Sequence, residues 1–248
     1  MRTNSGKFNI KTLNTIMTRR KYISAMKRKA IILISILSIA FLGKINAQEL
    51  RYGILAGGIF ANQKIETEGL DILNIDYDTQ SRFSWELGMM AEVPISDGLT
   101  VQPTLLLSNK GYVYKDSRDD FELTIKSRPV YLSLPIPICG HIMLDDLKFI
   151  AGLGPYASIG LGGKIDSTGN SGNFSFAEDG AIDYGDDDSD DYRPLDLGIV
   201  FTGGIEIQEF QLSLAYELGL KNIAPNGDED TVIRNRSLSL RGVYFLPF

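Results

Sequence analysis

The stretch LDLGIVFTGGIEIQEFQLSLAYELGL, residues 195–220, decides the fold prediction. Large apolar residues and small or charged residues take alternate positions in both halves, most clearly in FQLSLAYELG, residues 210–219. Successive side chains of a β-strand point to opposite faces, so each half is predicted to be a strand with one apolar and one polar face. Only residues 208–209 separate the halves, which predicts a tight β-hairpin.

The same alternation recurs on both sides of this hairpin, between clusters of turn residues. No later segment has the roughly 18 consecutive apolar residues of a transmembrane helix. The chain is therefore predicted to be all-β, with eight strands at Leu50–Phe60, Arg82–Ile95, Leu99–Tyr114, Phe121–Ile142, Leu147–Lys164, Pro194–Ile207, Phe210–Asn222 and Arg236–Phe248.

The connections between these segments alternate in length. The long ones are residues 61–81, 115–120, 165–193 and 223–235, and the short ones are 96–98, 144–146 and 208–209. Short turns at one end and long loops at the other are typical of barrels in the bacterial outer membrane. The sequence thus predicts an eight-stranded antiparallel up-and-down transmembrane β-barrel over residues 48–248, with the short turns in the periplasm.

Residues 26–47 have the pattern of a secretory signal peptide. A basic start, Lys27–Lys29, precedes an apolar run of 13 residues, 30–42, and a short small-ended segment that ends at Ala47. The predicted mature chain begins at Gln48, and an uncleaved anchor is the alternative. Residues 1–25 are basic and lack apolar periodicity, so they are predicted to be an extension without a fold.

Charge is distributed very unevenly along the chain. Residues 1–47 hold 10 of the 25 Lys and Arg and no Asp or Glu, which leaves 15 basic against 31 acidic residues after them, a net charge of −16. An acidic surface repels phosphates, so no nucleic-acid partner is expected. The single cysteine, Cys139, excludes an intrachain disulfide, and the single His141 excludes a multi-histidine metal site. We expect no cofactor.

Charged residues on the polar faces are predicted to point into the barrel. An eight-stranded barrel is just wide enough for side chains to fill it, and unpaired charges there would be costly, so Arg128 and Arg241 should pair with carboxylates. We interpret the set as a structural polar plug, with a proton or ion path as the alternative. Its members are Glu86, Glu92, Lys110, Arg128, Asp196, Glu206, Glu217 and Arg241.

Aromatic residues gather at both ends of the predicted strands, as in the aromatic girdles of membrane interfaces. Those beside short turns or the C-terminus are Phe149, Phe210 and Phe248, and those beside long loops are Phe60, Phe83, Tyr112, Tyr114 and Phe121. The last strand ends with Tyr244, Leu246 and Phe248 at alternate positions. We interpret these three as a C-terminal signal for the barrel-assembly machinery, and outer-membrane lipid as the partner of the apolar face.

The third long loop carries six aspartates within residues 183–191. The spacing of Asp186, Asp188 and Asp190 begins like a calcium-binding loop, but Asp191 stands where the loop needs Gly and Leu197 where it needs Glu. A solvated acidic loop is the interpretation, and no metal site is assigned.

Several short motifs in order along the chain resemble the PorT-like outer-membrane β-barrel proteins. They are GILAG (53–57), VQPTLLLSNKG (101–111), VYLSLP (130–135), AGLGPY (151–156), LDLG (195–198), GGIE (203–206) and LGLKNI (218–223). Thr104 and Ser133 stand where the family often has acidic residues. The resemblance implies an integral outer-membrane barrel without catalytic residues, and the founding member is tied to protein secretion.

The sequence therefore predicts a non-enzymatic outer-membrane protein with a structural, surface-interaction or secretion-accessory role. Secretion components or surface ligands would bind through the long loops. Two alternatives stay open: a soluble, exported, lipocalin-like binding barrel, and an outer-membrane enzyme that modifies lipid. The enzyme would need a nucleophile and a base near the outer leaflet, whereas His141 lies beside a short turn.

Overall fold

The computed structural model describes residues 50–67, 79–118, 121–171, 174–187, 189–225 and 231–247, which all belong to the compact unit of residues 49–248. The predicted signal peptide, the N-terminal extension and Phe248 lie outside the described residues. The strands are β1 (Arg51–Thr67), β2 (Thr79–Ser96), β3 (Leu99–Val101), β4 (Thr104–Asn109), β5 (Tyr112–Arg118), β6 (Phe121–Pro135), β7 (Ile138–Leu144), β8 (Leu147–Ser171), β9 (Phe174–Ala181), β10 (Leu195–Ile207), β11 (Phe210–Gly219) and β12 (Thr231–Phe245).

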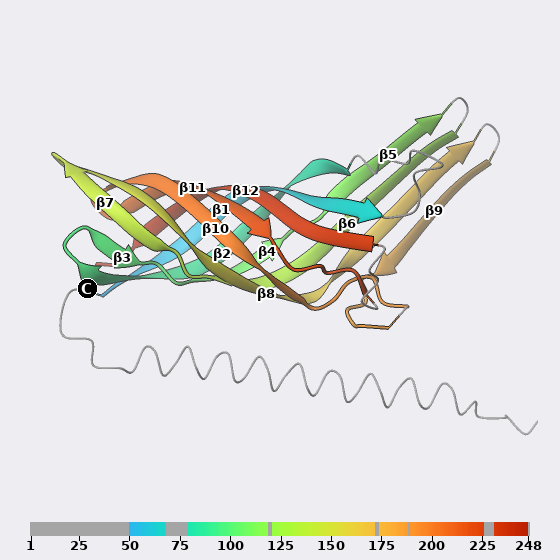
Figure 1. Cartoon of the computed structure of the whole chain (residues 1–248). Coiled ribbons are helices and arrows are strands. Elements are labelled where there is room, and N and C mark those ends of the chain that lie inside the picture. The colour runs from blue at the N-terminus through green and yellow to red at the C-terminus, as the bar shows by residue number, and fades with distance from the viewer. Residues whose placement is uncertain are drawn as a thin grey trace, which may run out of the picture. The chain divides into compact units, whose positions relative to one another are not determined.

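Antiparallel pairing closes these strands into a ring with eight positions (Figure 1). β1 pairs with β12 on one side and β2 on the other, and the ring continues from β12 through β11 and β10 to β8. β6 and β7 together fill the position beside β8, and β3, β4 and β5 fill the next one. The predicted eight-stranded antiparallel barrel is confirmed.

The breaks between β6 and β7 and between the pieces of β3–β5 do not open the wall. The amide of Gln102 donates to the carbonyl of Pro137 at 3.0 Å, and the amide of Lys110 donates to that of Pro129 at 2.9 Å. At Gly111 the backbone has φ +123°, a conformation that L side chains rarely adopt, and a Cβ would strike the carbonyl of Ser127. Gly111 thus lets the chain kink between β4 and β5 while the barrel stays closed.

Two-residue turns at 97–98, 145–146 and 208–209 connect the strands at one end of the barrel, as predicted. Gly98, Asp145 and Gln208 have φ values of 88°, 52° and 56°, the positive values that tight hairpins require. We call this the short-turn end and the opposite end the long-loop end.

At the long-loop end the strands run further than the alternation predicts. Residues 115–118 of the predicted loop at 115–120 belong to β5, and β1 continues to Thr67. The predicted loop at 165–193 contains the end of β8 and the whole of β9. These boundaries were wrong because hydrophobic alternation marks only the part of a strand that has an apolar outer face, and these extensions lack one.

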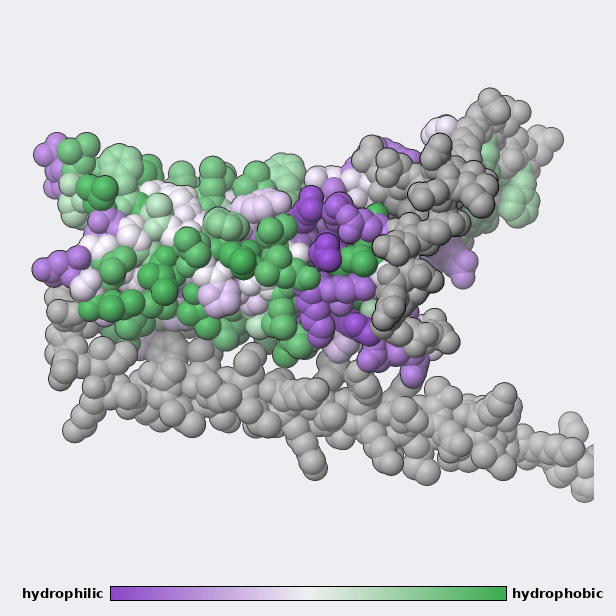
Figure 2. All heavy atoms as spheres, in the orientation of Figure 1, coloured by the Kyte–Doolittle hydropathy of each residue, from purple (hydrophilic) through white to green (hydrophobic). Residues whose placement is uncertain are grey.

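The outer face of the barrel carries a broad apolar belt (Figure 2). Outward side chains remain highly exposed, with Met89 at 63% and Leu153 at 59%. From Phe210, the first residue of β11, to Leu220, the residue after its end, the belt advances ten residues, about 25 Å along the barrel axis for the usual rise and tilt. That length matches the apolar band of an outer-membrane barrel. Hydrophilic side chains take over where the strands leave the belt (Figure 2).

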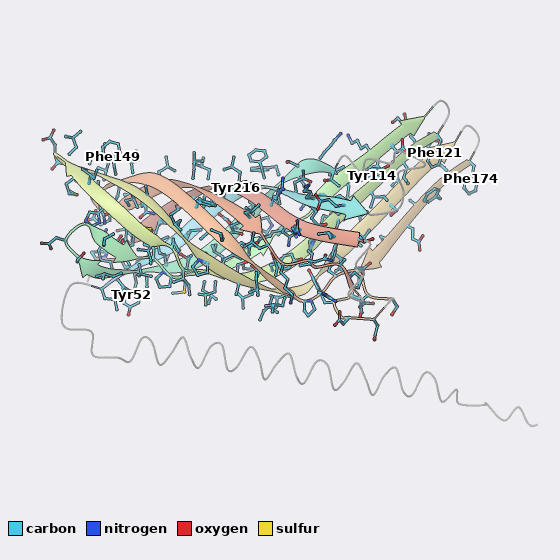
Figure 3. The ribbon with its side chains drawn as sticks, in the orientation of Figure 1. Tyr52, Tyr114, Phe121, Phe149, Phe174 and Tyr216 are labelled. Atoms are coloured by element: carbon cyan, nitrogen blue, oxygen red, sulfur yellow. The ribbon has the colours of Figure 1, made fainter. Side chains whose placement is uncertain are left out.

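Aromatic pairs lie on the outer face toward each end of this belt. The rings of Phe210 and Tyr244 are 4.8 Å apart toward the short-turn end, and those of Phe60 and Phe83 are 5.0 Å apart toward the long-loop end. Phe149 lies at the short-turn end (Figure 3). These positions are the ones expected of two aromatic girdles. Among the described residues, no helix has the length and apolar character to cross a membrane.

Beyond the belt, β5, β6, β8 and β9 continue as a four-stranded antiparallel sheet, which we call the wing (Figure 1). Paired residues on neighbouring strands share a face of a sheet. Phe121 pairs with Ser171 and Ser171 with Phe174, while Leu123 pairs with Gly169 and Gly169 with Phe176. One face of the wing therefore carries Phe121, Leu123, Phe174 and Phe176, and we call it the apolar face, although Asp116 and Glu178 also lie on it; it is continuous with the barrel interior. The other face is polar, with Glu122, Thr124, Lys126, Asp166, Thr168, Asn170 and Asp179.

Candidate functional site

A chain of ion pairs crosses the middle of the barrel interior. Arg241 on β12 donates from Nε and Nη2 to both carboxylate oxygens of Glu86 on β2, at 2.7 and 3.1 Å. Its Nη2 also donates to Glu217 on β11 at 2.9 Å, and Lys110 donates to the other oxygen of Glu217 at 2.8 Å. All four side chains are buried. Each charge has an opposite partner, which buried charges require.

Asp196 on β10 extends this cluster, which we call the central cluster, toward the long-loop end. The amide of Asn235 donates to Asp196 at 2.9 Å, and the hydroxyl of Tyr156 donates to it at 3.3 Å. Asn235 in turn accepts from the Gln63 amide at 2.9 Å. The Lys110 ammonium lies 5.1 Å from the centre of the Tyr156 ring, within reach of a cation–π contact. A continuous polar network thus spans the lumen from β2 to β10.

A second set of ion pairs, the short-turn cluster, lies near the other end of the barrel. Arg51 donates to Glu92 at 3.0 Å and to Glu206 at 2.6 Å. Lys148 donates to the same two carboxylates, at 3.0 and 3.4 Å. Gln102 donates to Glu92 Oε2 at 2.8 Å, and Lys148 also reaches this oxygen, at 3.2 Å. Two cations therefore balance two carboxylates, and the cluster has no net charge.

An apolar layer lies between the two clusters. Along β2, Met90 lies between Glu92 and Glu86. Along β1, Leu55 lies between Arg51 and Gly57, the residue that pairs with Glu86. These residues pack with others from β4 and β12 in one buried cluster: Leu55, Met90, Leu106, Val243 and Phe245. Ion-paired and apolar side chains thus follow one another along the described interior, and side chains are able to fill a barrel of eight strands.

Tyrosine and aliphatic side chains close the long-loop end. Ile182, Tyr192 and Ile223 form a buried group against which Tyr184 packs. The Tyr192 hydroxyl donates to Gln63 at 3.2 Å and lies 2.9 Å from the Ser127 hydroxyl. Burial raises the pKa of Tyr192 well above its ordinary value, so the phenol keeps its proton. These contacts of Ile182, Tyr184 and Tyr192 hold the segment between β9 and β10 across the mouth of the barrel.

The structure brings seven of the eight predicted charged residues into the lumen. Glu86, Lys110, Asp196, Glu217 and Arg241 lie in the central cluster. Glu92 and Glu206 lie in the short-turn cluster.

The inward orientation predicted for Arg128 was wrong, whereas its predicted pairing with a carboxylate is confirmed. Its neighbours Ser127 and Pro129 are buried inward, so Arg128 points to the outer face and pairs with Asp166 of β8. β6 has left the belt at this point and entered the wing, where an outward charge meets water. The periodic pattern could not reveal where the belt ends.

Sequence reasoning also missed two cations of the short-turn cluster, Arg51 and Lys148. Lys148 precedes the outward Phe149, so the same period-two rule would have placed it inside. Arg51 lies at the first position of β1, where no alternation precedes it. Ser133, at a position where the resembled family often has an acid, instead shares a 2.7 Å hydrogen bond with Ser158.

The acidic segment 183–191 makes hydrogen bonds within itself and with Arg193. The Asp190 carboxylate accepts from the amide of Asp187 at 2.9 Å, and Asp186 accepts from Arg193 at 2.7 Å. In the part of the chain that the structure describes, no three His, Cys, Asp or Glu side chains are grouped to hold a metal ion. At the C-terminal end, Tyr244 points outward, Leu246 is half-buried, and Phe248 lies outside the described residues.

A family model described as "Outer membrane protein beta-barrel domain" matches residues 46–224. Among solved structures, the chain is similar to Ail, the attachment invasion locus protein of Yersinia pestis, with 11% identity, a TM-score of 0.35, and coverage of 80% of this chain and 100% of that one. It is also similar to Neisserial surface protein A, with 12% identity, a TM-score of 0.38, and coverage of 79% and 99%. No curated protein matches the chain.

Proposed function

Because the chain belongs to the outer membrane protein beta-barrel domain family and is an integral outer-membrane protein, we propose that it is a non-enzymatic binding protein of the bacterial cell surface. The barrel serves as an anchor, and the wing is the part that binds. The observation that carries the proposal is the apolar face of the wing, which stands beyond the belt with Phe174 at 68% and Phe176 at 40% exposed.

The barrel interior supports an anchoring role better than a transport role. The central cluster, the apolar layer and the short-turn cluster follow one another along the axis, and each fills the lumen with side chains that already have partners. A solute would have to break several buried ion pairs to pass. Loops and extended strands at the outer surface are the usual places for binding in a barrel with a rigid wall.

The resemblance to PorT-like proteins suggests the kind of partner. We include secretion components among the candidate partners because the founding member of that group is tied to secretion. Outer-membrane lipid would cover the belt, and the barrel-assembly machinery would read the C-terminal strand with Tyr244, Leu246 and Phe248.

Cysteine labelling on intact cells tests whether the wing faces the outside. Ser175 is an exposed residue of β9, and Ser175→Cys should react with a membrane-impermeant maleimide on whole cells. Native Cys139 is fully buried in the barrel wall and should stay unlabelled, which makes the unmodified chain a matched control. Labelling of Ser175→Cys only after the outer membrane is opened would place the wing in the periplasm and overturn the proposal.

A further inference from the structure

β9 has an open hydrogen-bonding edge in the described part of the chain. It pairs only with β8, and all eight of its residues are exposed. The amide of Ile182, just after β9, donates to Gly163 of β8 at 3.1 Å. Amides of an antiparallel strand point to its two neighbours in turn, so those of Ser175, Ala177 and Asp179 point away from β8. Such an edge is a template for another strand.

The side chains along this edge change character from one end to the other. Phe174 and Phe176 lie on the apolar face, and the Phe176 ring lies over Gly169 of β8, where a side chain would collide with it. Glu178 and Asp179 follow on the two faces, and neither makes an ion pair with another described residue. The edge therefore presents an apolar half and an acidic half.

We propose that the open edge of β9 binds an extended segment of a partner protein by β-strand addition. The segment has apolar side chains beside Phe174 and Phe176 and basic side chains beside Glu178 and Asp179. Main-chain hydrogen bonds supply affinity in this mode, and alternate side chains supply specificity. The inference rests on the proposed function and names the chemistry of its partner.

The same charges disfavour a second copy of this chain as the occupant. Parallel self-pairing through this edge would set Glu178 beside Asp179 of the second copy, and antiparallel pairing about Ala177 would set Phe176 against Glu178. Like charges directly opposite each other destabilise a sheet, and a carboxylate against a ring leaves both without a suitable neighbour. A partner segment with a basic half and an apolar half places its cations beside Glu178 and Asp179 and its apolar side chains beside Phe174 and Phe176.

The test measures binding of a fluorescein-labelled peptide, TTKRVFTV, to the full chain refolded in detergent micelles, by fluorescence anisotropy. Antiparallel to β9, this peptide sets its basic pair beside Glu178 and Asp179 and its apolar half beside Phe174 and Phe176. We expect saturable binding. Ala177→Pro, which removes an outward amide, and the double change Glu178→Lys with Asp179→Lys should each weaken binding about tenfold.

A charge-reversed peptide, TTEEVFTV, should bind the double variant better than it binds the native chain. Glu122→Lys is the control, because it reverses the charge of one carboxylate two strands away from the edge and should leave binding unchanged. Absent binding, or binding that these β9 variants do not alter, would overturn the inference. So would a dimer of the native chain that Ala177→Pro dissolves, since the occupant would then be a second copy.

This outcome is separable from that of the proposed function. If Ser175→Cys is labelled on intact cells but the peptide does not bind, only the strand-addition inference fails. If Ser175→Cys is not labelled, both fail.

Discussion

Arg241 forms ion pairs with two carboxylates in the middle of the lumen. Without this side chain, the negative charges of the central cluster would exceed its positive ones. Glu217 has a second cation in Lys110, whereas Glu86 has no other ion pair with a described residue. The alternation of the strands predicts that both glutamates point inward, because position parity alone sets the face. It does not predict which cation meets which carboxylate, since that depends on strand register and on side-chain reach.

Arg241→Met should therefore destabilise the barrel by about 3–5 kcal/mol, the usual cost of leaving a buried charge without its partner. The measurement is urea unfolding in lipid vesicles, followed by the fluorescence of Trp85, the single tryptophan, which faces outward. Lys64→Met is the control, since it breaks only the exposed pair with Glu66 and should leave the midpoint unchanged. Equal midpoints for the two variants would show that the central cluster contributes no stability.

Gly111 allows a second test of how a single residue contributes to the stability of the barrel. Its φ of +123° and the nearby Ser127 carbonyl leave no room for a Cβ. Gly111→Ala should cost about 1–3 kcal/mol, the usual range for strained backbone positions, in the same unfolding assay. Gly180→Ala, at a position with open space around it, is the matched control and should have little effect. A neutral Gly111→Ala would mean that the chain between β4 and β5 relaxes without strain.

At the scale of elements, the eight strands and the three short turns follow from the sequence, whereas the wing does not. Apolar alternation reports a strand only where lipid covers one face and the lumen the other. In the wing, the outer face carries residues such as Lys126 and Asp166, and the apolar face carries Phe121 and Phe174. The apolar side of the strands thus changes from the outer to the inner face in the wing. The sequence pattern therefore predicts a loop there.

The half of the wing formed by β8 and β9 should be separable from the barrel. Replacing residues 166–179 with Asn-Gly joins Ile165 to Gly180, which already pair across β8 and β9. The shortened chain should still fold, because the central and short-turn clusters and the belt stay intact. A folded barrel runs faster on a gel before boiling than after it, and the shortened chain should keep this difference. Its loss would show that this half of the wing is part of the folding unit.

At the scale of the whole molecule, three layers stacked along the axis close the lumen, and the apolar belt holds the barrel in the membrane. Closure of the ring follows from the count of strands and the alternation of connections. The filling of the lumen by side chains does not follow from the sequence pattern. It depends on Arg51 and Lys148 lying beside Glu92 and Glu206, and on Tyr192 lying over the barrel mouth. These residues are far apart in sequence and meet only when the ring closes.

Conductance across a planar lipid bilayer shows whether the lumen is closed, as an anchoring role requires. The refolded chain, shown to be inserted by its heat-dependent gel mobility, should give no stepwise current at either polarity. The triple change Glu86→Ala, Glu217→Ala and Arg241→Ala is the comparison, because it removes three of the four charged side chains of the buried chain of ion pairs. Discrete, reproducible current steps from the native chain would show that the lumen is open and that the protein is a channel.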